Sequence, residues 1–190
     1  MKTPDYEMAA METIAQATER IPLGYMQLPV FGKESPLYRE RVYCYELYHQ
    51  MRIVMDEMAV IPHSLTGEVD KVGCPIFRDT FLDRAKPDIL IHGAGTMDNL
   101  CAIEVKPVNG KYNGFRKDLM TLTAMRRLEH VAYKVAVLLV YGPNATEAHL
   151  RELLLQASHD KRAEGMIDIT LIRFFWHREA KQQAGEFFLE

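Results

Sequence analysis

Two carboxylates and one ammonium group stand at a suggestive spacing near the middle of the sequence. Asp88 is followed, after a spacer of fifteen residues, by Glu104 and then by Lys106. Two converging carboxylates, helped by a backbone carbonyl and water, form a hard oxygen site suited to Mg²⁺ or Mn²⁺. A lysine beside them can orient or deprotonate a water molecule and can offset the negative charge that develops at phosphorus. These residue types therefore suit the metal-assisted hydrolysis of a phosphodiester.

Two predicted strands, joined by a tight hairpin, must bring these side chains together. Residues 88–92 and 100–107 are apolar, β-branched runs, and the GAGTMDN segment between them has turn chemistry. If the loop is centred near Thr96, opposite residues have numbers that sum to about 192, so Asp88 stands opposite Glu104 provided that no bulge shifts the register. The alternative is a surface hairpin with cross-strand ion pairs, each contributing about 0.2–1 kcal/mol. Charges embedded in strands this apolar are costly unless they are paired or bound to a metal.

The Pro-Asp pair, the spacer and the Glu-Val-Lys run resemble the signature of the PD-(D/E)XK nuclease superfamily. That superfamily includes type II restriction enzymes, Holliday-junction resolvases and phage exonucleases. The resemblance covers residues 37–141 and implies a restriction-endonuclease-like core with the order α-β-β-β-α-β. It also implies that Asp88, Glu104 and Lys106 are catalytic, that the two acids bind Mg²⁺ or Mn²⁺, and that the substrate is nucleic acid, DNA in preference to RNA.

Many members of this superfamily add a third carboxylate from the helix before the first strand. Glu46, within the predicted helix 37–58, is the best match for this third metal ligand. Glu40 on the same helix is the runner-up, and Glu68 or Asp70 on the next predicted strand are further candidates. Alternatively, Glu46 is a helix acid satisfied by a neighbouring arginine, Arg52 or Arg41.

The whole sequence predicts one α/β domain, residues 1–190, with a mixed sheet. Helical and extended spacing of the apolar residues sets the elements. An N-terminal helix precedes the core, and a helix and a strand follow it. The predicted helices are residues 5–20, 37–58, 115–130 and 144–163, the last with Asn144 as N-cap, and the predicted strands are residues 68–72, 88–92, 100–107, 133–141 and 167–176.

The predicted helix after the motif is basic, although the chain as a whole has a net charge of -3. Six basic residues stand against Asp118 and Glu129 between residues 111 and 134. This surplus suits a helix that lies along a phosphate backbone, and a solvated helix face is the alternative. The expected nucleic-acid contacts are Lys111, Arg116, Lys117, Arg126 and Arg127.

Composition limits the other functional classes. With 48% hydrophobic and 26% charged residues the chain can form a folded core. Its three cysteines are odd in number and widely spaced, which argues against a disulfide framework and a zinc cluster. The longest apolar run, residues 135–141, is far shorter than the roughly 20 residues of a membrane span. We therefore expect a cytoplasmic protein without a membrane association.

A second hypothesis keeps the fold without the catalysis. The chain would then be an inactive or partner-dependent nuclease-fold subunit that binds nucleic acid or protein in a larger assembly. The aromatic residues expected to be exposed for an interface with that partner are Tyr38, Tyr43, Tyr112, Phe187 and Phe188. For the nuclease hypothesis a homodimer is also reasonable, because cutting both strands of a duplex needs two sites or one site used twice.

Overall fold

The computed structural model describes residues 5–68, 85–129 and 132–189. These residues contain five α-helices and six strands, with two short 3₁₀ turns near the C-terminal end. The helices are α1 (Tyr6–Glu19), α2 (Leu23–Met26), α3 (Glu40–Met58), α4 (Tyr112–Arg127) and α5 (Glu147–Ser158). The strands are β1 (Ser64–Gly67), β2 (Ile89–His92), β3 (Asn99–Pro107), β4 (Val135–Tyr141), β5 (Arg173–His177) and β6 (Gly185–Phe187).

All six strands join one mixed sheet in the spatial order β1-β2-β3-β4-β5-β6. The first three strands are antiparallel neighbours, β3, β4 and β5 run parallel, and β6 returns antiparallel to β5. The helix α4 connects the parallel pair β3 and β4, as such a crossover requires. The predicted α/β class with a mixed sheet flanked by helices is therefore confirmed, and the elements from α3 to β4 follow the predicted order α-β-β-β-α-β.

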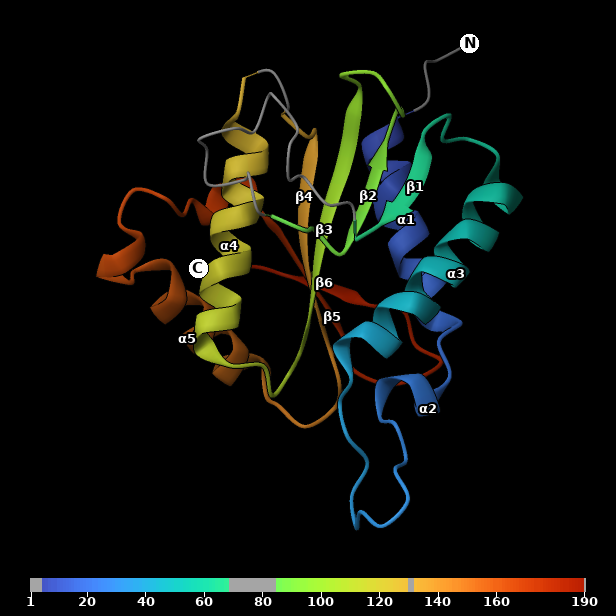
Figure 1. Ribbon diagram of the computed structural model, residues 1–190, viewed down its shortest axis with the longest axis vertical. Coiled ribbons are helices and arrows are strands. Elements are labelled where there is room, and N and C mark those ends of the chain that lie inside the picture. Colours follow the sequence, from blue (N-terminus) through green and yellow to red (C-terminus); the bar gives the residue numbers. More distant parts are fainter. Residues whose placement is uncertain (1–4, 69–84, 130–131, 190) are drawn as a thin grey trace.

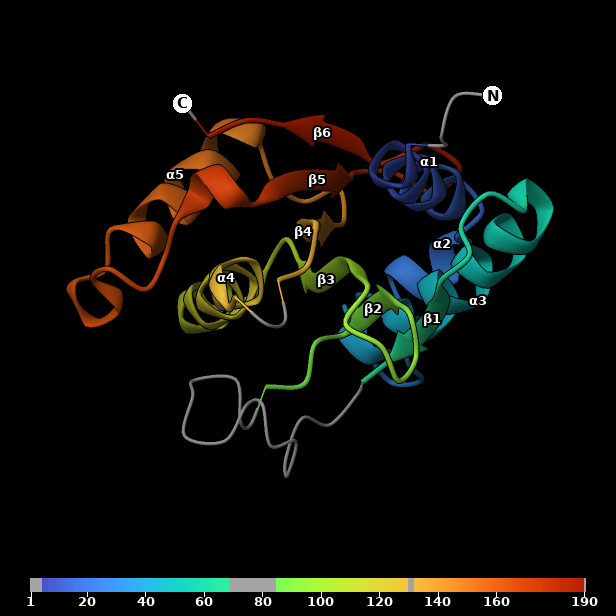
Figure 2. The same ribbon diagram turned by 90° about the horizontal axis from the view of Figure 1, so that it is seen from above.

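Helices cover both faces of the sheet, α1 to α3 on one face and α4 with α5 on the other (Figures 1 and 2). The alternation of side chains along β3 divides the core between these layers. Ile103 and Val105 belong to the cluster under α1 and α3, whereas Ala102 belongs to the cluster under α4. Glu104 and Lys106 have the same parity as Ala102, so they leave the sheet on the side of α4.

The ends of the helices follow their local chemistry. Asp5 caps α1, because its carboxylate accepts hydrogen bonds from the amides of Glu7 and Met8, both at 3.1 Å. The helix α3 ends where Ala59 adopts a left-handed conformation with φ of 50°. The α5 cap is Thr146 rather than the predicted Asn144, since the Thr146 hydroxyl accepts the His149 amide at 3.2 Å.

The first strand is Ser64–Gly67, earlier in the chain than the predicted strand 68–72. Glu68, the part of the predicted strand that lies within the described residues, has a φ of 45°. A left-handed residue does not continue a strand, so β1 ends before it. Near the C-terminus, the predicted strand 167–176 is a 3₁₀ turn followed by β5, and β6 is an additional strand that the sequence did not indicate.

Two of the aromatic residues expected at an interface lie in the core instead. Tyr43 is fully buried and stacks on Tyr141 with ring centroids 3.9 Å apart, and its hydroxyl lies 2.8 Å from His177 Nδ1. Phe187 is buried as well, whereas its neighbour Phe188 is exposed. The thiols of Cys44 and Cys101 are free and buried, and Cys74 lies outside the described residues. No helix in the described part of the chain combines the length and the apolarity needed to cross a membrane.

Candidate metal and phosphodiester site

The strand register brings the two motif carboxylates together, as the sequence predicts. Ile89 pairs with Ile103 and Leu90 with Ala102, which places Asp88 opposite Glu104 at the next position. A register shift does occur, but it lies between Ile91 and His92, on the turn side of the motif. The carboxyl groups of Asp88 and Glu104 are neighbours, and each shifts the pKa of the other.

Burial and mutual repulsion govern the protonation of this pair. Burial is the main cause that raises the pKa of Glu104 well above its ordinary value, and the charges of Asp118 and Asp88 raise it further. Burial also raises the pKa of Asp88, partly offset by the amide of Val105, which donates to Asp88 Oδ2 at 2.7 Å. The pair therefore holds a proton at pH values at which free carboxyl groups have lost theirs.

Lys106 lies beside the pair and contacts two further acids. Its Nζ is 2.8 Å from Glu40 Oε2 and 3.1 Å from Asp118 Oδ2. Burial by itself lowers the pKa of Lys106, but the Asp118 and Glu40 carboxylates more than offset this effect and the pKa rises. Lys106 is consequently a charged ammonium at neutral pH, suited to stabilising negative charge rather than to accepting a proton.

The helix acid that reaches the motif is Glu40, the runner-up of the sequence analysis. Glu40 lies in the first turn of α3, next to the C-terminal end of β3. Glu46 lies six residues further on, about 240° around the helix axis, and its Oε1 accepts a hydrogen bond from Gln50 at 2.7 Å. Glu68, a further candidate, pairs with Arg41 at 3.0 Å. Asp70 lies outside the described residues.

The site opens to solvent on the side of Asp88. A hollow of about 150 Å³ is lined by Glu40, Glu68 and Asp88 together with two cationic residues, Arg41 and Lys86. An adjoining cleft of about 420 Å³ shares Asp88 and Glu68 and is otherwise lined by aromatic and small side chains, Cys44, Tyr45, Tyr48, Gly67 and Ile89. Asp88 is thus reachable from solvent, whereas Glu104 is only 5% exposed.

The donor set fits a hard divalent cation, because the buried carboxyl group of Glu104 and the half-buried one of Asp88 are neighbours with raised pKa values. A cation that displaces the proton held by this pair would replace the repulsion between the two acids with a favourable contact to each carboxylate. Within the described ranges no group of three or more His, Cys, Asp or Glu residues is arranged around one point. A metal held by these residues would therefore take Asp88 and Glu104 as its protein carboxylates and complete its shell with carbonyl oxygen and water.

Three of the five residues predicted to contact nucleic acid form ion pairs or hydrogen bonds within the chain. Arg116 pairs with Asp160 at 2.8 Å, and Arg127 pairs with Asp168 at 3.0 Å. Arg126 donates to the backbone carbonyls of the two residues before β4, Tyr133 and Lys134. The other two predicted contacts, Lys111 and Lys117, are exposed.

Asp118 also belongs to the site, although the sequence analysis named it only as one of two acids among the basic residues of this helix. It is 3% exposed and occupies the buried stripe of α4 with Phe115, Leu119 and Leu122. Burial raises the pKa of Asp118 to about 7, against the lowering effect of Lys106. An acid at helical spacing within an apolar stripe is the sequence signal for such a buried partner.

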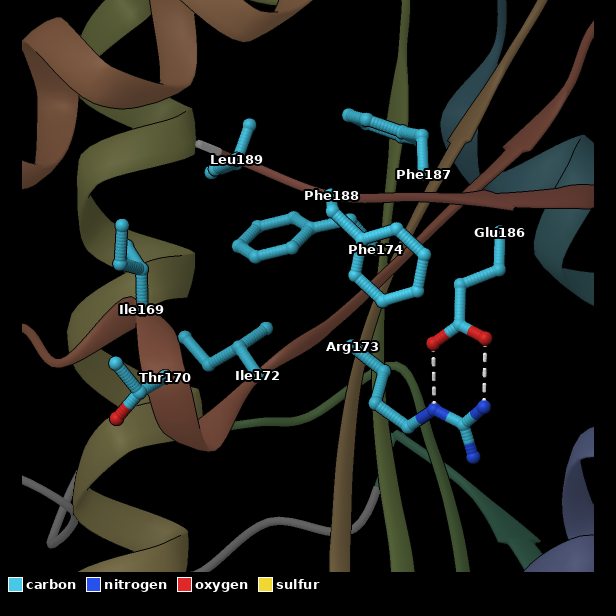
Figure 3. A pocket seen from close by; sticks show the side chains of 9 residues that line it. All are labelled: Ile169, Thr170, Ile172, Arg173, Phe174, Glu186, Phe187, Phe188 and Leu189. Atoms are coloured by element: carbon cyan, nitrogen blue, oxygen red, sulfur yellow. Dashed lines mark hydrogen bonds and ion pairs between the residues drawn. The ribbon is translucent and has the colours of Figure 1, made fainter.

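A second hollow, of about 390 Å³, lies at the other end of the sheet and has a different character (Figure 3). Its lining is largely apolar and comes from β5, β6 and the neighbouring segments. The acid in it, Glu186, forms two hydrogen bonds with Arg173, each 2.6 Å long. Its charge is thereby neutralised across the strand pair, so this hollow lacks the chemistry of the Asp88 site.

Comparison of the chain with protein-family models, with curated proteins and with solved structures found no match in any of the three. The interpretation of the site therefore depends on its own geometry and on the resemblance of its motif.

Proposed function

We propose that this protein is a metal-dependent nuclease of PD-(D/E)XK type, with a restriction-endonuclease-like fold, that hydrolyses phosphodiester bonds in nucleic acid, DNA in preference to RNA. The observation that supports this most is the pairing of the half-buried Asp88 and the buried Glu104 across the hairpin, with Lys106 beside them. A hairpin ion pair has no need of two adjacent acids, whereas a cation site does.

In this proposal Asp88 and Glu104 hold Mg²⁺ or Mn²⁺, and Glu40 replaces Glu46 as the acid from α3 nearest the site. A cation held there would supply Lewis acidity toward the scissile phosphate and would lower the pKa of a water molecule. The protein itself contributes the charge of Lys106, which orients the attacking water and stabilises the negative charge that develops on the phosphate oxygens. The amide of Val105 keeps the Asp88 carboxylate aimed at the end of β3 through its 2.7 Å hydrogen bond.

Access also favours a polymeric substrate over a small one. The hollow beside Asp88 is lined by Arg41 and Lys86 as well as by acids, and it continues into the larger cleft. Cationic side chains at the rim suit a phosphate that approaches Asp88. Lys111 and Lys117, both exposed on or just before α4, remain the proposed contacts for more distant phosphates.

The test is cleavage of labelled single- and double-stranded DNA and RNA in Mg²⁺ or Mn²⁺, with EDTA as the metal-free control. Lys106→Ala should lower the rate at least about 10²-fold, because it removes a charge aimed at the transition state. Lys161→Ala is the matched control, since Lys161 is an exposed lysine in a 3₁₀ turn after α5. The proposal fails if none of the four substrates is cut, or if Lys106→Ala cuts as fast as the wild type. Absence of cutting with retained, salt-dependent binding would favour the nuclease-fold binding subunit instead.

A further inference from the structure

Lys106 lies in a cradle formed by two residues of α4. Its Nζ is 3.1 Å from Asp118 Oδ2. Gly114, one helical turn earlier on the same face of α4, lies over its aliphatic stem, so that a Cβ at this glycine would be 3.3 Å from Lys106 Cε. A Cβ at this position would therefore crowd the lysine stem.

The two acids that contact Lys106 differ in exposure. The side chain of Asp118 is 4% exposed, and that of Glu40 is 37% exposed. Glu40 lies on the solvent side, next to the hollow that leads to Asp88. Water or a phosphate oxygen can therefore replace Glu40 as a partner of the Lys106 ammonium. Asp118 stands on the buried face of α4, where water and substrate cannot take its place.

We infer that Asp118 is a positioning residue that anchors the Lys106 ammonium from the buried side, and that Gly114 leaves the space in which the lysine stem lies; this inference rests on the proposed function. Glu40 is the exchangeable partner. Asp118 fixes the direction of the ammonium toward the Asp88–Glu104 pair, and Lys106 keeps this direction when Glu40 gives way to substrate. The role of α4 at the site is therefore to hold the lysine.

The first experiment observes the ammonium directly and requires no catalysis. Lys106 in the wild type should give a resolved ¹⁵Nζ–H signal in NMR spectra, because a largely buried ammonium that contacts a buried carboxylate exchanges its protons slowly. The signal should shift or disappear in Asp118→Asn and shift in Gly114→Ala. Thr121→Val is the matched control, since Thr121 is a buried polar residue on α4 whose hydroxyl donates to the Lys117 carbonyl. An unchanged signal in Asp118→Asn would overturn the inference.

The second experiment measures kcat and KM for whichever substrate the wild type cuts. Asp118→Asn should lower kcat by about 10²-fold, as expected for a misdirected catalytic group, with little change in KM. Gly114→Ala should lower kcat in the same direction by a smaller factor, and Thr121→Val should leave kcat unchanged. In the Lys106→Ala background, Asp118→Asn should have no further effect, because the group that it positions is already gone.

Three results would overturn the inference. One is an additive effect of Asp118→Asn on top of Lys106→Ala, and another is a kcat in Asp118→Asn equal to that of the wild type. The third is a loss of Mg²⁺ affinity in Asp118→Asn as large as that in Asp88→Asn, which would make Asp118 a ligand rather than an anchor. If the wild type cuts none of the substrates, the proposed function fails, while the NMR experiment still decides the role of Asp118.

Discussion

The ionised form of Glu104 is unfavourable in the folded protein because the side chain is buried, so Glu104→Gln is an informative substitution. Glu104 is 5% exposed and its carboxyl group neighbours that of Asp88, and burial together with the charges of Asp118 and Asp88 raises its pKa well above the ordinary value of 4.5. Glutamine has the shape of the protonated acid and keeps the ability to donate to Asp88. The substitution therefore mimics the neutral form at every pH.

The sign of the effect follows from proton linkage. Since the folded pKa of Glu104 lies above its unfolded value, folded molecules keep the proton in a pH range in which unfolded molecules release it. The stability that the protonated Glu104 contributes is fully present below about pH 4.5 and is lost as the pH rises toward its folded pKa. A difference of one proton gives a limiting slope of about 1.4 kcal/mol per pH unit, so the wild type should lose stability between pH 5 and pH 7 through this residue, by at most about 3 kcal/mol.

Urea and thermal unfolding at pH 5 and pH 7, in EDTA, measure this slope. Glu104→Gln should match the wild type at pH 5 and exceed it at pH 7, by about 5–10 °C in Tm for a chain of this size. Mg²⁺ should reverse the order at pH 7, because it binds the wild-type pair and stabilises the folded state. The control Glu46→Gln alters an acid that bonds Gln50, and it should keep the wild-type slope. Identical pH slopes in wild type and Glu104→Gln would refute the shared-proton description of the site.

Binding of Mg²⁺ at pH 7 should release about one proton, which calorimetry in buffers of different ionisation enthalpy measures, and binding without proton release would contradict the exchange of proton for metal. Glu40→Gln should reduce cleavage more than Glu46→Gln, and the reverse order in a rate assay would restore Glu46 as the functional helix acid. Tyr43→Phe should cost about 1–2 kcal/mol in urea unfolding, because it removes the hydroxyl 2.8 Å from the buried His177 Nδ1; a loss below 0.5 kcal/mol (roughly the noise of such measurements) would mean that this contact contributes little. The expected homodimer is tested by light scattering on a sizing column, where a strict monomer would favour nicking, single-strand or exonuclease action.

The contact between Asp88 and Glu104 was predictable because it depends on two local rules. Alternation along the strands and the position of the turn together set the pairing, and the pairs from Ile89 to Ile91 follow the predicted sum. The register shift at His92 does not disturb the motif because it occurs beyond the motif, next to the turn. Apolar, β-branched runs likewise located β2, β3 and β4 within a few residues.

Features that depend on long-range partners were not predictable from local patterns. The basic surplus on α4 suggested phosphate contacts, but the partners of Arg116 and Arg127 are Asp160 and Asp168, more than forty residues downstream. The three-residue strand β6 exists because β5 offers it an edge, and its own sequence is too short for a periodic signal. The choice between Glu40 and Glu46 also depends on where the end of β3 lies against α3.

The balance of charge at the site favours a bound cation over the simple hairpin. Four carboxyl groups gather there, those of Glu40, Asp88, Glu104 and Asp118, and Lys106 contributes one positive charge among them. Surface ion pairs tolerate such an imbalance because water screens them, but Glu104 and Asp118 are nearly inaccessible to water. Burial raises the pKa values of Asp88, Glu104 and Asp118, and the charges of the neighbouring acids raise them further, so that protons supply positive charge at low pH. At neutral pH a divalent cation between Asp88 and Glu104 would supply the missing positive charge, next to the ammonium group of Lys106.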